Sequence, residues 1–284
     1  MSSDLRPYQT VSLSVIKGQY ARLLKGKAEL TDFRFKFIRI AAPRFASIDL
    51  DFEIEVDSMP RSNIHAIIGR NGVGKTTLLN GMINAITNRG GSLEKFINTE
   101  GSENSEISND YFSSLVSVSF SASDPFPPPK EQPDPAKGTC YFYIGLKGIE
   151  NAELHRTISD LQNDCIKALI NCFQESKKKN RWFNAMEKLG SDENFSLMKL
   201  EILHSAYTNV RDNENPKTDS PSFIHAYREA VTPILSRMSS GHAVVLLTIT
   251  RLVATVEEKT LVLLDEPESH LHPPTVVCVR TCTF

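Results

Sequence analysis

Residues 69–76 read Gly69-Arg70-Asn71-Gly72-Val73-Gly74-Lys75-Thr76 and fit the pattern G-x-x-x-x-G-K-[ST]. Glycines at these spacings let successive backbone N–H groups turn inward around phosphate oxygens, and a helix that follows adds its positive N-terminal end. Lys75 is expected to reach the β- and γ-phosphates of a nucleotide, and the hydroxyl of Thr76 to bind Mg²⁺. The stretch therefore predicts a nucleotide-binding turn that continues through Thr77.

The flanks of this turn have the order that the pattern requires. Ile64 to Ile68 is apolar and is predicted to be a short strand that enters the turn, and Thr76 to Ile86 is predicted to be the helix that leaves it. The alternative is a chance match, which average glycine usage gives in roughly one chain of this length in a hundred. The strand–turn–helix context favours the nucleotide-binding interpretation.

A second stretch combines a buried strand with two acids, in the sequence Leu261-Val-Leu-Leu-Asp265-Glu266. Asp265 is predicted to hold Mg²⁺, usually through water, and Glu266 to orient or deprotonate an attacking water. The predicted catalytic residues are therefore Lys75, Asp265 and Glu266, with Thr76 and Asp265 as metal ligands. An exposed acidic strand end is the plain alternative, and the phosphate-binding pattern in the same chain speaks against it.

A third stretch, Met238-Ser239-Ser240-Gly241-His242, opens a predicted helix that runs from Ala243 to Val256. Two hydroxyls, a glycine and a helix N-terminus can form a second anion site. A serine N-cap beside a glycine is the plain alternative, and it is common. The order of the three stretches along the chain decides between these two interpretations.

That order resembles the ABC ATPases, in which a signature loop lies between the phosphate-binding turn and the acidic strand end (Walker B). The resemblance implies that ATP and Mg²⁺ are the cofactors. It also implies that Ser239 contacts the γ-phosphate of ATP bound to an opposite protomer, with Ser240 and Gly241 beside it. ATP would then lie between two heads of a head-to-tail homodimer or a higher homo-oligomer.

Finer features narrow the resemblance. Asp265-Glu-Pro-Glu-Ser-His-Leu-His-Pro273-Pro274 has the form found in AAA15/OLD-type ATPases rather than in transporters. Together with Ser-Ser-Gly-His and with Val118-Ser-Phe-Ser-Ala-Ser-Asp-Pro-Phe126, it is most similar to PtuA, the ATPase of the Septu antiphage system, which also occurs with retrons. This resemblance implies an ATP-binding and ATP-hydrolysing subunit of a soluble defence complex, whose nucleotide state gates a separate PtuB-like HNH nuclease. The alternatives are a hydrolysis-deficient ATP-binding regulator or remnant, a DNA-repair ATPase and a transporter ATPase subunit.

The sequence departs from the ABC pattern in two places. Ser119 and Ser121 stand where a Q-loop glutamine is expected, and Gln132 lies in a proline-rich loop. Residues 275–284 lack the pattern of the amphipathic helix that should follow Walker B, and no switch histidine follows. The chain is therefore expected to be C-terminally truncated, for example by a frameshift, and to bind ATP better than it hydrolyses it.

The remaining pattern indicates an α/β fold: a P-loop NTPase of the ABC ATPase type, with an antiparallel β edge and a helical insertion. Alternating apolar and charged residues at 33–40 and 48–56 predict an antiparallel pair with one solvated face, and 115–120 and 141–146 are further strand candidates. Helices are expected within 150–205 and 223–237, separated by a polar linker at 211–221. Residues 97–110 are expected to be flexible.

The expected organisation has four parts along the chain: an N-terminal extension, a nucleotide-binding lobe, a helical insertion with its linker, and a segment with the signature, Walker B and a truncated C-terminus. Their boundaries are 1–31, 32–149, 150–222 and 223–284.

Composition sets the remaining limits. The 284 residues carry a net charge of −2, with 40% hydrophobic and 23% charged residues, which is ordinary for a folded domain and unlike a generally basic nucleic-acid binder. The 5 cysteines do not suggest a disulfide framework, and no signal peptide or membrane-length apolar run is present, so a cytoplasmic protein without membrane contact is expected.

Three weaker signals in the sequence each have a plain alternative. Lys177-Lys178-Lys179-Asn-Arg181-Trp182 could contact nucleic acid, but a solvated helix end with an inward-facing tryptophan is favoured. Zinc at His270, His272, Cys278 and Cys282 is disfavoured. Phe45 could stack on adenine, with help from Arg44, and core packing of its ring is an equal alternative.

Overall fold

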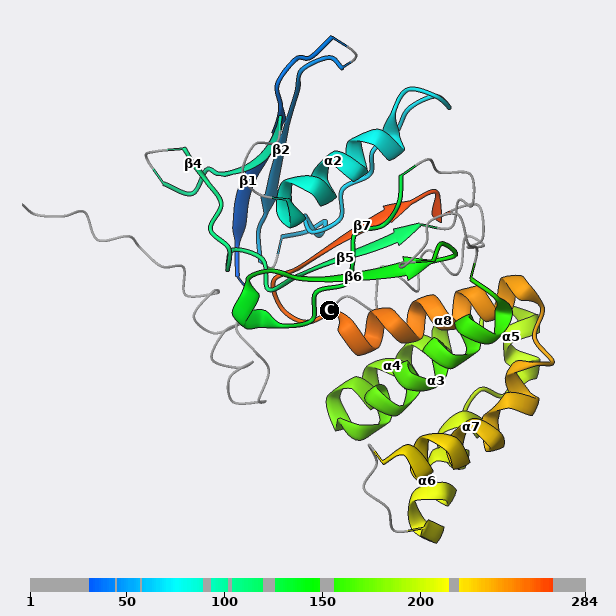
Figure 1. The fold of residues 1–284 in the computed structure, drawn as a ribbon. Helices are drawn as coiled ribbons and strands as arrows, with labels where there is room; N and C mark the ends of the chain where they lie inside the picture. Colours follow the sequence, from blue (N-terminus) through cyan, green and yellow to red (C-terminus); the bar gives the residue numbers. More distant parts are fainter. Residues whose placement is uncertain are drawn as a thin grey trace, which may run out of the picture.

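The computed structural model describes residues 31–43, 45–56, 58–88, 93–101, 104–119, 126–148, 156–214 and 220–267. Figure 1 shows an antiparallel sheet beside a parallel sheet, with helix α2 (Lys75–Thr87) on one side of the parallel sheet and a group of helices on its other side. The predicted extension at 1–31 lies outside the described residues except for Thr31. The division of the chain into domains stays a prediction.

The antiparallel sheet begins with β1 (Phe33–Arg39) and β2 (Ile48–Ile54), which pair as the alternating pattern predicts. Phe35 and Phe37 are buried on one face. On the other face, Lys36 of β1 pairs with Asp51 of β2 at 3.1 Å between Nζ and Oδ1. The prediction of an antiparallel pair with one solvated face is confirmed.

Two further strands complete this sheet, in the order β2-β1-β3-β4. They are β3 (Glu94–Asn98) and β4 (Ser105–Glu106), and they pair with each other in antiparallel fashion. The expectation of a flexible 97–110 segment is therefore wrong for these residues. The polar composition of this segment did not indicate strands, because the sheet buries only a few of its side chains. These include Phe96 of β3 and Ile107, the residue after β4.

The parallel sheet consists of β5 (Ser114–Ser119), β6 (Cys140–Gly145) and β7 (Thr260–Asp265), in the order β6-β5-β7. Its central strand β5 is covered on both faces: Leu115 belongs to the core beneath α2, whereas Val116 and Val118 belong to the core of the helical layer. A parallel sheet between two helical layers fits a P-loop NTPase. The register places Ser119 opposite both Asp265 and Gly145, so the carboxyl ends of the three strands meet at one edge.

The strand predicted at Ile64–Ile68 is not formed. Ile64 and Ile67 are about two-fifths exposed and Ile68 is 94% exposed. A strand forms where its backbone pairs with a neighbour, and within the described residues the segment 64–68 pairs with no strand, although one edge of β7 is open. The apolar pattern at 64–68 is typical of a strand, but it contains no information about which neighbouring strand the segment would pair with.

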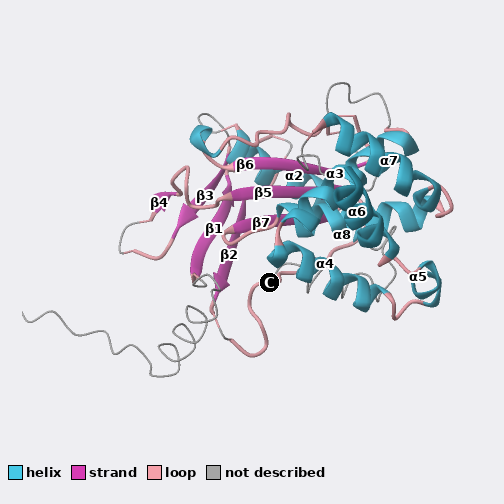
Figure 2. Cartoon of the chain, turned by 90° about the horizontal axis from the view of Figure 1, so that it is seen from below, coloured by secondary structure: helices cyan, strands magenta, loops and turns pink. Residues whose placement is uncertain are grey.

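Within the described residues, six helices form the layer on the other face, and Figure 2 shows them gathered beside the strands. Their bounds are α3 (Ile158–Gln174), α4 (Ser176–Leu189), α5 (Glu193–Met198), α6 (Ile202–Glu214), α7 (Pro221–Leu235) and α8 (Ser240–Thr255). Helix α6 continues through Glu214, so the predicted linker at 211–221 is wrong in its first residues. In the part of the chain that the structure describes, no helix is both long and apolar enough to cross a bilayer.

The core of this layer explains the basic stretch at 177–182. Trp182 is fully buried, and its Nε1–H donates a hydrogen bond to Thr250 Oγ1 at 3.1 Å. Arg181 donates to the backbone carbonyls of Val253 and Val256 at the C-terminal end of α8. The tryptophan therefore packs inward, as favoured, and the ring is not available to stack on a base.

The buried hydrogen bond between Trp182 and Thr250 gives a stability prediction. Thr250→Val keeps the volume of the side chain but leaves the indole N–H without its acceptor, so the free energy of unfolding should fall by about 1–3 kcal/mol. Denaturant unfolding measures this change. In a Trp182→Phe background, which has no N–H to satisfy, Thr250→Val should cost much less; an equal cost in both backgrounds would contradict the assignment.

Candidate functional site

The turn at 69–74 takes a backbone conformation that its glycines allow. Gly72 and Gly74 have φ angles of 79° and 96°, in the left-handed region that other residues rarely adopt. Gly74 is the N-cap of α2, and Lys75 and Thr76 are its first two residues, with Thr77 following. The two left-handed glycines thus lead directly into the N-terminus of α2, and a glycine-rich turn before a helix N-terminus favours phosphate binding.

The side chain of Lys75 folds back over this turn. Its Nζ donates hydrogen bonds to the carbonyl oxygens of Gly69 at 2.9 Å and of Arg70 at 3.4 Å. Arg70, Asn71 and Val73 are exposed at the surface. The ammonium is therefore held at the turn itself, within reach of a group that the turn encloses.

Helix α2 connects this turn to the parallel sheet. It packs against β3, β5 and β7, and its buried residues Leu78 and Met82 belong to the same core as Leu263 of β7. The interior packing of α2 therefore fixes the position of the turn relative to the end of β7.

The two predicted acids lie at that end. Asp265 is the last residue of β7 and is only 7% exposed. Glu266 follows it with a φ of 47°, which is uncommon for a residue with a side chain. The structure places Asp265 in a cavity with Leu79 and Asn80 of α2, so it brings the acid strand end and the phosphate-turn helix together.

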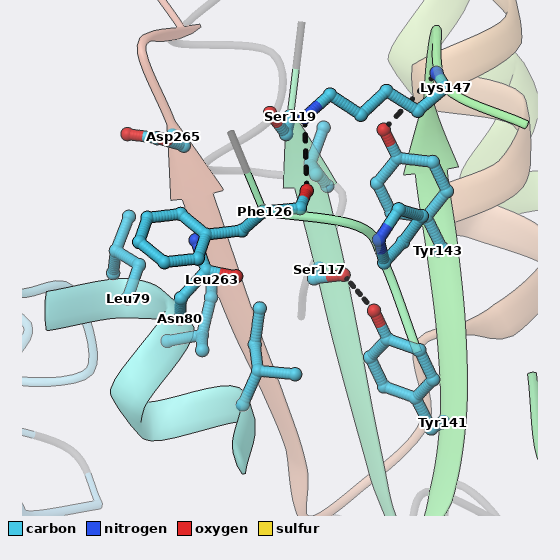
Figure 3. Close-up of a pocket in the computed structure, with 13 residues that line it drawn as sticks. Leu79, Asn80, Ser117, Ser119, Phe126, Tyr141, Tyr143, Lys147, Leu263 and Asp265 are labelled. Carbon is cyan, nitrogen blue, oxygen red and sulfur yellow. Dashed lines mark hydrogen bonds between the residues drawn. The ribbon is translucent and has the colours of Figure 1, made fainter. Parts of the chain in front are cut away.

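The cavity at the carboxyl ends of the strands contains residues that the sequence reasoning missed (Figure 3). Besides Asp265, it is lined by Ser119 of β5, by Lys147 after β6 and by Phe126. Deeper in it, Ser117 Oγ and Tyr141 Oη are 2.8 Å apart. A lysine just after an apolar strand is normally a solvated strand end, so the sequence contained no signal that Lys147 turns inward.

Ser239 is the N-cap of α8, and its Oγ accepts a hydrogen bond from the backbone N–H of His242 at 3.3 Å. The same oxygen lies 2.8 Å from His242 Nδ1. Ser240 and Gly241 are the first two residues of the helix. The plain N-cap interpretation is therefore correct as a description of local structure, and Ser239 is not among the residues that line the Asp265 cavity.

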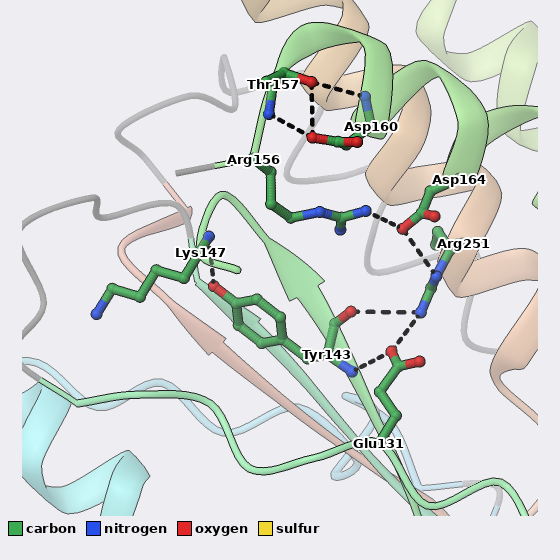
Figure 4. A network of polar contacts seen from close by, with 8 residues as sticks. All are labelled: Glu131, Tyr143, Lys147, Arg156, Thr157, Asp160, Asp164 and Arg251. Carbon is green, nitrogen blue, oxygen red and sulfur yellow. Dashed lines mark hydrogen bonds and ion pairs between the residues drawn. The ribbon is translucent and has the colours of Figure 1, made fainter. Parts of the chain in front are cut away.

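A network of charges joins the helical layer to the sheet (Figure 4). Arg251 of α8 contacts Glu131 Oε1 at 2.8 Å and Asp164 Oδ2 of α3 at 3.3 Å, and Arg156 also contacts Asp164. Glu131 Oε1 in turn accepts from the backbone N–H of Tyr143 in β6. Helix α8 is thus connected to the parallel sheet by hydrogen-bonded ion pairs.

Several weaker predictions also have outcomes. Phe45 is 43% exposed and lies under the Arg39 guanidinium, so core packing of its ring is wrong, while adenine stacking stays a prediction. Gln132 pairs with Tyr141 and accepts a hydrogen bond from the backbone N–H of Asp134, which is a structural role in its loop.

Other predictions fall on residues that the structure does not describe. These residues are Arg44 and the segment 270–284, which contains the histidines and cysteines of the disfavoured zinc site. Among described residues, no group of three or more His, Cys, Asp and Glu side chains is placed to hold a metal ion.

Comparison with known proteins gives two similarities. Residues 174–281 match the family model described as "AAA domain, putative AbiEii toxin, Type IV TA system". The chain is 54% identical over 265 residues to protein ea59 of Escherichia phage lambda, a match that covers 93% of this chain and 50% of ea59. The chain therefore spans about half the length of this relative. No solved structure matches.

The family match contains Ser239, Asp265 and Glu266 but not the phosphate turn, which precedes it in the chain. It supports an ATPase of the AAA or ABC-like kind and a nucleotide-binding function. The assignment of individual residues to the site depends on the phosphate-binding pattern in the sequence and on the local geometry of the turn and of the end of β7.

Proposed function

We propose that this chain binds ATP with Mg²⁺ at the turn of residues 69–76 and hydrolyses it with the help of Asp265 and Glu266. The main support for this proposal is that helix α2 connects the phosphate turn to the acidic end of β7. Its N-terminus carries Lys75 and the left-handed glycines, and its side lies against Asp265 at the end of β7. Phosphate and metal ligands are thus on adjoining elements.

In this site each group has a separate task. Backbone N–H groups of the turn and the Lys75 ammonium would hold the phosphates, and the hydroxyl of Thr76 and the carboxylate of Asp265 would hold Mg²⁺, which neutralises phosphate charge. Glu266 follows Asp265 directly and can orient the water that attacks the γ-phosphate. Phosphate release from MgATP tests the activity. Binding without release would instead support an ATP-binding regulator.

We further propose that two copies of the chain enclose ATP in an ABC-type dimer. Ser239 supports this idea, because it is exposed at a helix N-terminus, and Gly241 beside it has open space where a Cβ would lie. Such an end attracts phosphate. In the dimer, the γ-phosphate held by one protomer would contact the α8 N-terminus of the other.

Ser239→Asp tests the dimer without unfolding α8. Aspartate is as good an N-cap as serine, so the helix should persist, while its negative charge repels a phosphate. In a Glu266→Gln background with MgATP, the parent should sediment as a dimer and Ser239→Asp as a monomer. Ser220→Asp, at the N-cap of α7, is the matched control. A dimer in both variants would exclude this role for Ser239.

We also propose that the ATPase acts in conflict between phages and their hosts, where its nucleotide state gates a partner. The phage relative and the description of the matching family support this setting. The Septu assignment with an HNH nuclease partner rests on the motif resemblance alone. A phage-challenge assay with wild type and Lys75→Ala, each expressed with its neighbouring genes, tests the role: plating efficiency should depend on Lys75.

A further inference from the structure

The cavity at the strand ends contains a buried lysine that the proposed function has not used. Lys147 is 4% exposed, although lysine is among the side chains least often buried. It lies just after β6, at the same edge of the sheet as Asp265. A buried ammonium is costly unless charges or hydrogen bonds compensate for the lost water, so the groups around Lys147 bear on what the cavity can bind.

Local structure directs this lysine inward. The Tyr143 hydroxyl accepts a hydrogen bond from the backbone N–H of Lys147 at 3.4 Å. A Cβ on Gly145 would lie 2.2 Å from that hydroxyl and 2.3 Å from the carbonyl oxygen of Ser119. Glycine at 145 therefore lets the tyrosine fold over the end of β6 and orient the chain that follows.

The ammonium reaches across the ends of the strands. Lys147 Nζ donates to the carbonyl oxygen of Phe126 at 2.9 Å, and Figure 3 shows its side chain extending toward Ser119 on β5. Ser119 Oγ is buried and has no hydrogen-bond partner within the described part of the chain. A buried hydroxyl without a partner is unfavourable, and a bound water, ion or ligand can remove that cost.

These groups fit one kind of ligand. An ammonium and a hydroxyl are donors that suit a phosphate oxygen, and the Asp265 carboxylate in the same cavity suits a metal ion bound to that phosphate. Apolar walls, including Leu79, Leu263 and Phe126, lower the local dielectric constant and strengthen such contacts.

We propose that Lys147 and Ser119 bind the terminal phosphate of the nucleoside triphosphate whose Mg²⁺ is held by Asp265. Lys147 is then a second cationic ligand beside Lys75, and it distinguishes ATP from ADP. This inference rests on the proposed function, because it places the nucleotide at the turn of residues 69–76.

The test is calorimetric titration of the full chain with MgATP and, separately, with MgADP. Lys147→Met keeps most of the side-chain volume and removes the charge, and it should weaken ATP binding about tenfold or more while changing ADP binding less than twofold. Ser119→Ala is a small change that the fold should tolerate, and it should weaken ATP binding about threefold or more. Lys137→Met, at a largely exposed lysine, is the control and should change neither affinity.

The outcomes separate the two proposals. If wild type binds neither nucleotide, the proposed function fails. If wild type binds both but Lys147→Met and Ser119→Ala keep its ratio of ATP to ADP affinity, the inference fails while the proposed function stands. Equal losses for ATP and ADP would mean a structural role and would also overturn the inference. If Lys147→Met does not fold, the ratio in Ser119→Ala decides.

Discussion

Lys75→Ala is expected to abolish the stabilisation that MgATP gives to the folded protein. A ligand at a hundredfold its Kd, bound only to the native state, adds about 2.7 kcal/mol to the free energy of unfolding. The Lys75 ammonium already lies at the turn, bonded to the carbonyl oxygens of Gly69 and Arg70, so binding phosphate requires only a local movement. Without it, the turn lacks the cation that balances the phosphates.

Chemical denaturation with and without MgATP measures this effect. Lys188→Ala, which removes an exposed lysine in the last turn of α4, should retain the full stabilisation. Without nucleotide, Lys75→Ala should be nearly as stable as wild type, because Lys75 bonds only to exposed loop carbonyls. An equal stabilisation by MgATP in wild type and Lys75→Ala would refute the assignment of the phosphate turn.

Glu266→Gln is expected to lower ATP turnover by on the order of 10²–10⁴ while ATP binding is kept, since a general base is typically worth that much. Glutamine has nearly the same size and can adopt the same left-handed backbone, for which φ is 47° at this position. Asp265, the proposed metal ligand, is unchanged. The loss should therefore appear in kcat and not in nucleotide affinity.

Steady-state phosphate release at saturating MgATP provides the measurement, with Glu187→Gln on the exposed side of α4 as a matched control. Unchanged turnover in Glu266→Gln would show that another group positions the water. Absence of turnover in wild type itself, with binding retained, would favour the alternative of a hydrolysis-deficient regulator.

The sequence predicted those parts of the site that depend on local chemistry. The glycines at 72 and 74 and the capped start of α8 at Ser239 follow from backbone geometry that a few neighbouring residues determine. The end of β7 at Asp265 was visible because a fully apolar run stops at two acids. Each of these features needs no knowledge of distant residues.

Features that depend on pairing across the chain were not predictable. Ile64–Ile68 has the composition of a strand, but within the described residues this segment pairs with no strand. Lys147 resembles a solvated strand end until Tyr143 and the missing side chain of Gly145 direct it inward. In both cases the deciding contacts come from the three-dimensional arrangement of strands, which the local pattern does not specify.

Direct titration of the wild-type chain with ATP, in the presence and absence of Mg²⁺, tests the central claim that residues 69–76 and Asp265 form a nucleotide site. We expect saturable binding with one ATP per chain, tighter with Mg²⁺ than without it, and lost in Lys75→Ala. Absence of binding, or equal binding by wild type and Lys75→Ala, would contradict it.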